Sequence, residues 1–292
     1  MEYIFWFSTI FIFYTYAGYP LLIFALASRY KPILGNPDDQ NEWPNITIII
    51  PVHNEEENVI NKLDNLKSLD YPQDKLEIIF VSDASTDDTN KLLASADNIK
   101  LISYFPRKGK PTALNKAVSE VKSDIILFTD VRQELDAPAA KFLVSTLNQN
   151  NVGAVSGELV HRDPLTHTGR NVGLYWRYEK WIRKAESQFH STAGVTGALY
   201  VIRRNDYIPL LEDTLLDDFE VPIQILKNNK RVVFDPRAKI YDEVQEESVA
   251  EQKRKIRTLT GNYQSFLRHL WLFSPISNPI FIQFISHKVF RL

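Results

Sequence analysis

Four short runs of apolar, mostly branched side chains alternate with segments of helical pattern along the middle of the chain. The runs are ITIIIP (Ile46 to Pro51), LEIIFVS (Leu76 to Ser82), DIILFTD (Asp124 to Asp130) and VGAVSGELV (Val152 to Val160). Runs of this length without polar alternation are typical of strands buried on both faces. Because strands that alternate with helices pair in parallel through right-handed crossovers, the sequence predicts an open α/β sheet.

Composition excludes several other classes of protein. Of the 292 residues, 44% are hydrophobic and 24% are charged, which is ordinary for a globular chain. Lys and Arg number 34 against 36 Asp and Glu, so no basic excess points to a nucleic-acid partner. The sequence contains no Cys, which excludes a disulfide framework, a zinc-thiolate site and a cysteine nucleophile.

The N-terminal segment has the composition of a membrane anchor. No side chain is charged from Tyr3 to Ser28, and a helix of this length would be about 39 Å long, more than the ~30 Å hydrocarbon core of a bilayer. A cleaved signal peptide would need a basic start, whereas Glu2 follows Met1. The sequence predicts a single-pass anchor over residues 1–30, with a buried core helix as the alternative. Arg29 and Lys31 after it place the rest of the chain in the cytoplasm, at the cell membrane.

The rest of the chain divides by composition into three parts. A segment rich in Pro, Asn and Asp over residues 31–45 predicts a linker, and the strand and helix pattern predicts one domain over residues 46–245. Over residues 246–292, a basic helix is followed by aromatic residues interleaved with Arg268 and Lys288. This pattern favours amphipathic helices that bind membrane lipid at the interface rather than a further span.

Polar clusters follow the first two predicted strands, where open α/β sheets bind their ligands. In the first cluster, PVHNEEE, the candidate binding residues are Pro51, His53, Asn54 and Glu55. In the second cluster, VSDASTDDT, Asp83 comes first after the strand and can accept hydrogen bonds from a base or a ribose. Helix capping is the alternative for Asn54, Asp87 and Asp88.

Two further clusters carry charge suited to phosphates and cations. FPRKGKPTALNKA places Arg107, Lys108 and Lys110 around Gly109, before a helix whose start can hold anionic oxygens, although a solvated loop is the alternative for the first two. ILFTDVRQ ends an apolar strand with Asp130, which brings a carboxylate to the sheet edge where hard cations and phosphates meet. Capping of the following turn is the alternative role for Asp130.

The last two clusters lie in the second half of the chain. LLDDFEVP sets Asp217 beside Asp218, and because adjacent acids repel, one of them is expected to have a raised pKa suited to a base. Helix capping is the alternative. EQKRKIRTLTGN places Arg254 and Arg257 on a basic helix, which suits either a pyrophosphate or anionic lipid.

Taken in order, these motifs resemble those of the membrane-bound family 2 glycosyltransferases, the GT-A-fold group that includes cellulose, chitin and hyaluronan synthases. PVHNEEE is similar to the opening motif of that family, VSDASTDDT to its nucleotide-binding aspartate motif and RKGKPTALNKA to its lysine-glycine-lysine loop. The resemblance covers roughly Pro44 to Leu292. It implies a GT-A fold, an α/β architecture with a Rossmann-like open mixed sheet, between the anchor and the interfacial helices.

The resemblance also implies roles for individual residues. Asp130 matches the first aspartate of the metal-binding DxD motif, which implies Mg or Mn, and Asp218 matches the base that deprotonates the acceptor, with Asp217 on the acceptor side. GVTGALYVIRR resembles the acceptor-lining segment, with Gly197 at its glycine, and RKIRT resembles the Q-x-x-R-W helix, with Arg257 at its arginine. The nucleotide-sugar-binding residues so implied are Pro51, His53, Asn54, Glu55, Asp83, Lys110, Asp130, Arg254 and Arg257.

Three departures from the family pattern matter. Arg132 replaces the second DxD aspartate, which weakens the metal site or lets a guanidinium take part of its charge role. Arg254 replaces the glutamine and Thr258 the tryptophan of Q-x-x-R-W, so processive polymerisation is not implied. The family usually has membrane helices after the catalytic domain, whereas this sequence stops at SHKVFRL, which leaves a missing C-terminal membrane region open.

The sequence therefore predicts an inverting hexosyl- or N-acetylhexosaminyltransferase. It would move a sugar from a nucleotide-diphosphate-sugar, expected to be a UDP-sugar, to a hydroxyl of a growing polysaccharide or glycolipid at the cytoplasmic membrane face. The expected partners are this donor, a saccharide or lipid-linked acceptor, membrane lipid and an export partner. Two alternatives are single-sugar transfer to a polyprenyl phosphate and, from another class, a catalytically inactive sugar-nucleotide-binding membrane subunit.

Overall fold

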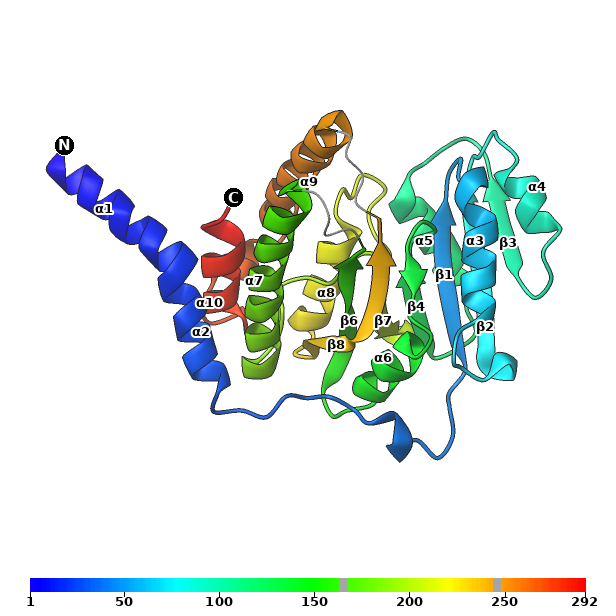
Figure 1. The fold of residues 1–292 in the computed structure, drawn as a ribbon, viewed down its shortest axis with the longest axis horizontal. Helices are drawn as coiled ribbons and strands as arrows, with labels where there is room; N and C mark the ends of the chain where they lie inside the picture. Colours follow the sequence, from blue (N-terminus) through cyan, green and yellow to red (C-terminus); the bar gives the residue numbers. More distant parts are fainter. Residues whose placement is uncertain (163–166, 244–247) are drawn as a thin grey trace.

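A mixed sheet with strand order β3-β2-β1-β4-β7-β6-β8-β5 forms the centre of the molecule in a computed structural model, which describes residues 1–162, 167–243 and 248–292 (Figure 1). The strands are β1 (Ile46–Val52), β2 (Leu76–Asp83), β3 (Lys100–Tyr104), β4 (Ile125–Thr129), β5 (Glu134–Leu135), β6 (Val152–His161), β7 (Leu199–Arg203) and β8 (Arg231–Asp242). The four apolar runs of the sequence correspond to β1, β2, β4 and β6, so those predicted strands are confirmed.

The direction of the strands changes partway across the sheet. β1 pairs in parallel with β2 and β4, so that Ile46 lies opposite both Leu76 and Ile125, and β3 continues the parallel half. β7 then runs antiparallel between β4 and β6. The carboxyl ends of β1, β2 and β4 therefore lie along one edge of the sheet, where the polar clusters follow them.

Helices cover both faces of the sheet (Figure 1). They are α3 (Glu56–Lys67), α4 (Thr89–Ala94), α5 (Lys110–Ser119), α6 (Ala139–Leu147), α7 (His167–Phe189), α8 (Asp217–Lys227) and α9 (Ser248–Arg268). Ile48 of β1 packs in one core with Val59 of α3 and Leu143 of α6. Its neighbour Ile49 points to the other face and packs in a second core with Leu114 of α5, as the alternation of side chains along a strand requires.

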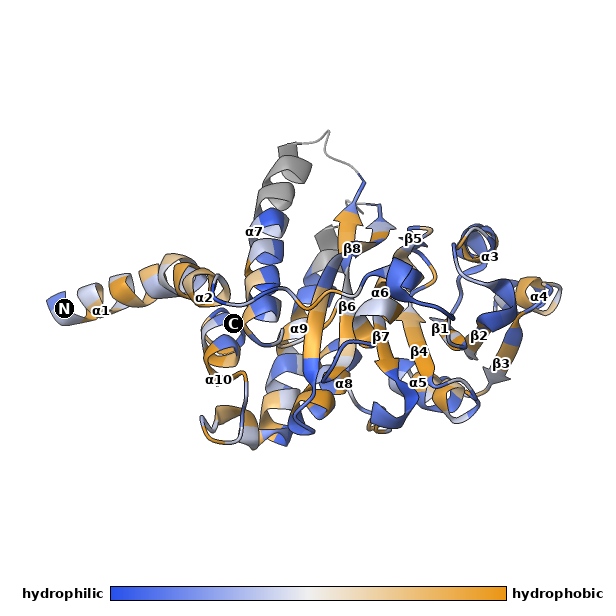
Figure 2. Ribbon diagram, turned by 90° about the horizontal axis from the view of Figure 1, so that it is seen from below, coloured by the Kyte–Doolittle hydropathy of each residue, from blue (hydrophilic) through white to orange (hydrophobic). Residues whose placement is uncertain are grey.

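One long helix at the N-terminus projects from the body, and Figure 2 shows few strongly hydrophilic positions along it. It consists of α1 (Glu2–Phe13), a π-helical turn (Tyr14–Gly18) and α2 (Tyr19–Ala27). The π turn comes just before Pro20, which lacks the N–H that a regular helix would use. No residue of α1 is buried, whereas Ile23 of α2 packs against Ile182 of α7. Among the described residues this is the one helix long and apolar enough to cross a membrane.

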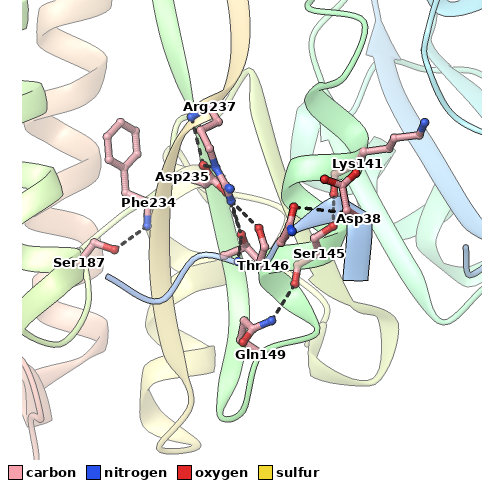
Figure 3. Close-up of polar contacts among 11 residues, drawn as sticks. Asp38, Lys141, Ser145, Thr146, Gln149, Ser187, Phe234, Asp235 and Arg237 are labelled. Carbon is pink, nitrogen blue, oxygen red and sulfur yellow. Dashed lines mark hydrogen bonds and ion pairs between the residues drawn. The ribbon is translucent and has the colours of Figure 1, made fainter. Parts of the chain in front are cut away.

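The segment predicted as a linker is bound to the sheet rather than loose. The Gly35 amide donates to Thr146 Oγ1 at 3.0 Å, and Arg237 of β8 donates to the Gly35 carbonyl at 2.7 Å. Figure 3 shows Thr146 and Arg237 gathered around Asp235, whose carboxylate is fully buried and accepts from both at 2.7 Å. Residues 31–45 therefore fix the course of the chain from the N-terminal helix to β1.

The C-terminal segment returns to the body after α9. It continues through short helical turns at Leu270–Phe273, Phe281–Gln283 (α10) and Phe284–Val289. Phe266, Ile280 and Phe284 are buried in the core beneath α5 and α8. The C-terminal segment thus contributes side chains to the core of the body. The domain boundary predicted between residues 245 and 246 lies outside the described residues.

Candidate active site

The first two polar clusters form one hydrogen-bonded unit at the carboxyl ends of β1 and β2. His53 Nδ1 lies 2.8 Å from the Asp83 carbonyl oxygen, and the Glu55 amide donates to Thr89 Oγ1 at 2.8 Å. Asn54 adopts a positive φ of 53° and accepts from the Thr86 amide at 2.8 Å. The Asn54 side chain therefore joins the two loops instead of capping α3.

Asp87 carries the capping role that the sequence offered as an alternative. Its carboxylate accepts from the Glu56 amide at 3.2 Å and from the Thr89 amide at 3.1 Å, so it satisfies the first turns of α3 and α4 together. The Asp88 side chain makes no such capping bond. Local helix chemistry thus accounts for Asp87.

Asp83 organises the basic loop that follows β3. Its two carboxylate oxygens accept from the Lys108 and Gly109 amides, each at 2.7 Å, and the side chain is only about 5% exposed. Gly109 has a φ of 87°, which favours glycine at the turn into α5. Contact of Asp83 with a nucleoside stays a prediction, whereas its visible effect is to fix the loop that carries Lys110.

Lys110 links Asp130, which follows β4, with Asp217, which begins α8. Its ammonium lies 3.0 Å from Asp130 Oδ1 and 3.2 Å from Asp217 Oδ2. Burial alone would lower the pKa of Lys110, but the two carboxylates outweigh burial and raise the pKa above its ordinary value. Lys110 therefore remains charged at the centre of the cluster, where it can neutralise a diphosphate.

Asp130 lies just beyond β4 with cations around it. Arg132 is turned toward Glu55, with Nε 3.0 Å and NH2 2.9 Å from Glu55 Oε1. Below it, Lys62 of α3 is buried and donates to the Gln133 carbonyl at 2.7 Å, and burial lowers the pKa of Lys62 to about 7. Sequence reasoning missed Lys62, although its place on the apolar face of α3, with Val59 and Leu63 at helical spacing, was a readable signal.

A divalent cation fits this site with a single protein carboxylate. Among the residues that the structure describes, no three His, Asp or Glu side chains gather in a way that could hold a metal. Mg²⁺ commonly takes only one or two carboxylates and completes its shell with substrate phosphates and water. Asp130 is partly exposed, and Lys110 bonds only to its Oδ1. Its Oδ2 can therefore supply one such ligand. A two-carboxylate DxD site does not fit, because Arg132 occupies the second position.

Asp217 and Asp218 are the first two residues of α8, and Asp217 faces Lys110. Burial, and then the charge of Asp217, raise the pKa of Asp218 to about 6, against the opposing effect of Lys110, Lys288 and Arg257. A carboxyl with this pKa is charged at neutral pH and still basic enough to accept a proton from a hydroxyl. These properties suit Asp218 to act as a general base.

The predicted acceptor-lining segment lies directly against Asp218. A methyl group on Gly197 would lie 3.2 Å from Asp218 Cβ and 3.4 Å from Asp218 Oδ2, so any side chain there would displace the aspartate. The Val195 amide donates to the Asp218 carbonyl at 3.0 Å. The structure therefore brings Gly197, Asp217 and Asp218 together, although they are about twenty residues apart in the chain.

Arg183 of α7 holds this acceptor segment from behind, and sequence reasoning did not select it. Its guanidinium donates to Thr196 Oγ1 and to Ser156 Oγ of β6, both at 3.0 Å, and lies 4.8 Å from the Phe234 ring centre. The Ser156 hydroxyl also accepts from the Thr196 amide at 2.8 Å. No local pattern distinguishes Arg183 from exposed neighbours such as Arg177, because its role depends on the strand it reaches.

Arg254 and Arg257 lie on α9, and both are exposed. The charge of Arg257 only partly opposes the rise that burial causes in the pKa of Asp218. Burial lowers the pKa of His161 at the end of β6, and the charge of Arg254 adds to that effect. Within the described parts of the chain, neither arginine donates a hydrogen bond to Asp130 or Asp217. Their contact with a pyrophosphate stays a prediction.

The fold is that of solved GT-A glycosyltransferases. Mannosyltransferase PcManGT from Pyrobaculum calidifontis, in complex with GDP-Man and Mn²⁺, matches with a TM-score of 0.79 and 25% identity over 98% of this chain and 81% of that one. Staphylococcus aureus TarS 1–349, in complex with UDP-GlcNAc, matches with a TM-score of 0.54 and 15% identity over 70% of this chain and 60% of that one. The second likeness shows the fold alone. The predicted GT-A fold class is confirmed.

Residues 47–210, more than half of the chain, match the sequence family described as glycosyl transferase family 2. The chain belongs to this family. The probable glycosyltransferase YdaM of Bacillus subtilis (strain 168) is 28% identical over 80% of this chain and 59% of its own length. Poly-beta-1,6-N-acetyl-D-glucosamine synthase of Staphylococcus epidermidis is 21% identical over 88% of this chain and 64% of its own. The chain thus spans less than two thirds of these relatives.

Proposed function

We propose that this protein is an inverting transferase that moves a sugar from a nucleotide-diphosphate-sugar to a saccharide or lipid-linked acceptor at the cytoplasmic face of the membrane. One observation carries the proposal: the Lys110 ammonium lies within 3.2 Å of both Asp130 and Asp217, next to the half-buried base Asp218. A phosphate-neutralising cation and a general base thereby meet in one cluster. Inverting sugar transfer needs both within reach of the same anomeric carbon.

The donor is proposed to bind along the edge formed by β1, β2 and β4. The unit made by Pro51, His53, Asn54 and Glu55 would form its floor, with Asp83 near the nucleoside. Lys110 at the start of α5 would neutralise the diphosphate, since a helix start favours anionic oxygens. The UDP-sugar expected from the family resemblance is kept as the proposed donor, and a GDP-sugar is tested beside it because PcManGT holds GDP-Man.

In the proposed reaction, the acceptor hydroxyl oxygen attacks the anomeric carbon from the face opposite the diphosphate. Asp218 takes the hydroxyl proton while the bond from the anomeric carbon to the diphosphate oxygen breaks, and the nucleoside diphosphate leaves with the electron pair. Lys110 offsets the charge that develops on this leaving group. A single displacement with one base inverts the configuration of the sugar.

We propose Mg²⁺ or Mn²⁺ as cofactor, held by Asp130 together with the donor diphosphate. When bound, such an ion stabilises the charge of the leaving diphosphate. Lys110 already supplies part of the positive charge that this stabilisation needs, and Arg132 occupies the position of a second carboxylate. The protein is therefore expected to bind the ion weakly until the donor supplies phosphate ligands.

The membrane location is proposed from two exposed apolar surfaces. The first is the N-terminal helix, with no buried residue in α1. The second is a stripe on α9, whose exposed members follow helical spacing; they are Ile256, Leu259, Tyr263 and Leu267. A helix with such a stripe beside basic residues suits the interface of an anionic membrane. Arg29 and Lys31 after the anchor favour a cytoplasmic body.

The proposal is tested with detergent-purified protein and a panel of UDP-, GDP- and dTDP-sugars, each with and without Mn²⁺ or Mg²⁺. Sugar transferred from one donor, with one nucleoside diphosphate released per sugar, is the expected result. Donor binding without transfer to any saccharide or lipid acceptor would contradict it and favour the alternative of an inactive sugar-nucleotide-binding subunit.

A further inference from the structure

The C-terminal turn Phe284–Val289 lies between the N-terminal helix and the acceptor side of the site. Ser286 Oγ is 2.8 Å from Tyr14 Oη, and the Phe290 ring packs against that of Phe11 with centres 4.9 Å apart. Tyr14 and Phe11 both belong to the proposed membrane anchor. One side of this turn is therefore attached to the anchor helix, as the position of the C-terminus beside α2 in Figure 1 also indicates.

Lys288, on the same turn, approaches the catalytic cluster instead. Its ammonium lies 5.8 Å from the ring centre of Phe219, the residue after Asp218. It also lies 3.9 Å from the position that a methyl group on Gly194 would take, in the segment that lines Asp218. Lys288 thus lies against Gly194 and Phe219, next to the base Asp218.

The positive charge of Lys288 acts on the Asp218 and Glu179 carboxylates but forms no direct ion pair in the described part of the molecule. The side chain is half-buried and takes part in no hydrogen bond or ion pair there, although it lies over the Phe219 ring. Its neighbours differ: His287 Nε2 lies 2.8 Å and Arg291 NH1 lies 3.0 Å from Glu179. A half-buried ammonium that touches no anion directly can still bind a ligand that brings one into contact.

Given the function proposed above, we propose that Lys288 binds the phosphate of a lipid-linked acceptor beside Asp218. A phosphate held here has the base on one side and the anchor helix on the other, so its lipid tail can follow that helix into the bilayer. Two kinds of acceptor share this chemistry. One is a lipid monophosphate that receives the sugar on its phosphate oxygen, and the other is a saccharide joined to lipid through a phosphate or diphosphate.

Binding is tested first, without donor, using farnesyl phosphate and farnesol as a pair that differs only in phosphate. The full chain in detergent is compared with K288Q, K288R and the control K227Q, which removes an exposed lysine at the far end of α8. We expect wild type to prefer farnesyl phosphate, and K288Q to lose affinity for it about tenfold, because the variant loses the charge-assisted hydrogen bonds to the phosphate. Farnesol binding should not change, and K288R and K227Q should behave as wild type.

Equal binding of farnesyl phosphate and farnesol by wild type, or an equal loss of both in K288Q, would overturn the inference. Retention of wild-type unfolding temperature by K288Q, and recovery of binding in K288R, separate charge loss from misfolding. Transfer assays then distinguish the sources: sugar added to farnesyl phosphate identifies a lipid monophosphate acceptor, and sugar added to a lipid-diphosphate saccharide identifies the other. Phosphate-selective binding without any transfer contradicts the proposed function, not the role of Lys288.

Discussion

Asp217 and Asp218 are neighbours in the chain, yet their surroundings separate their properties. Asp217 is placed 3.2 Å from the Lys110 ammonium, whereas Asp218 is held against Gly197 in a position where burial raises its pKa. Two adjacent carboxyls with different environments are how an active site obtains one base and one electrostatic partner. The base assignment at Asp218 therefore depends on packing as much as on sequence.

The raised pKa of Asp218 predicts an acid limb in the pH dependence of transfer. The base works only when deprotonated, and its pKa lies near 6, so kcat/KM should fall about tenfold per pH unit below pH 6 and level off above it. The measurement is kcat/KM for the acceptor between pH 4.5 and 8 with saturating donor. A rate that stays flat through pH 5 would contradict the assignment.

Gly197→Ala should impair the reaction without impairing donor binding. The added methyl would lie 3.2 Å from Asp218 Cβ, and a base displaced by a fraction of an ångström loses its geometry, at a cost of about tenfold to a hundredfold in kcat. Donor affinity is measured in parallel by calorimetry and should stay unchanged. In the control Gly18→Ala the methyl meets nothing closer than 3.4 Å, so kcat should be that of wild type. Equal kcat in all three proteins would refute the close-approach argument.

Arg132→Asp should strengthen metal binding by restoring a second carboxylate near Asp130. We expect wild type to bind Mn²⁺ weakly without donor and the variant to bind it at least about tenfold more tightly, since each added carboxylate favours a hard cation. Electron paramagnetic resonance of free Mn²⁺ measures the affinity. Arg132→Gln is the matched control, because it also breaks the ion pair with Glu55 but adds no ligand. If Arg132→Gln and Arg132→Asp change the affinity for Mn²⁺ equally, Asp130 is not part of a metal site.

At the scale of elements, the linker strap, which consists of residues 31–45 and is bonded through Gly35 to Thr146 and Arg237, is expected to stabilise the body. Arg237→Ala would leave the fully buried Asp235 carboxylate with Thr146 as its remaining side-chain donor, and this should lower the free energy of unfolding by about 3 kcal/mol. Arg162→Ala, which breaks an ion pair that is about half exposed, should cost less than about 1 kcal/mol. Urea denaturation in detergent compares the two. Similar losses would mean that the strap contributes no more than a surface pair.

The elements also differ in how well sequence predicts them. The sequence predicts β1, β2, β4 and β6 because each is a short run of mainly apolar residues, and burial on both faces explains such a run. β8 was not predicted, since it mixes Asp235, Arg237 and Lys239 with apolar residues, and the contacts that bury Asp235 come from α6. β3 lies at the edge of the sheet and is half-exposed, so its pattern is weak.

For the site, sequence motifs predicted the residues that follow strands, but not those that reach the site through tertiary packing. His53, Asp83 and Asp130 lie along one edge because parallel strands end together. Arg183 and Lys288 arrive from α7 and the C-terminal turn, and their spacing in sequence resembles that of any surface cation. The contact of Asp83 with the basic loop was equally unreadable, since it depends on the path of the chain after β3.

At the scale of the whole molecule, the anchor, α9 and the C-terminal turn lie toward one end of the molecule, while the motifs that follow β1 and β2 lie toward the other (Figure 1). In the proposed orientation, a lipid-linked acceptor would enter from the membrane and a soluble donor from the cytoplasm. It predicts that protease will cut the body in inverted membrane vesicles of an expression host and spare it in intact spheroplasts. Protection in inverted vesicles instead would reverse the proposed orientation.

The central claim is that Asp218 deprotonates the acceptor in a sugar transfer whose donor is held elsewhere in the site. The most direct measurement is the transfer rate of wild type and Asp218→Asn with the donor that the panel identifies, together with donor affinity for both proteins. The account predicts at least about a thousandfold loss of transfer in the variant, within the range expected for removal of a general base, with donor affinity unchanged. Transfer by Asp218→Asn at a rate near that of wild type would contradict it.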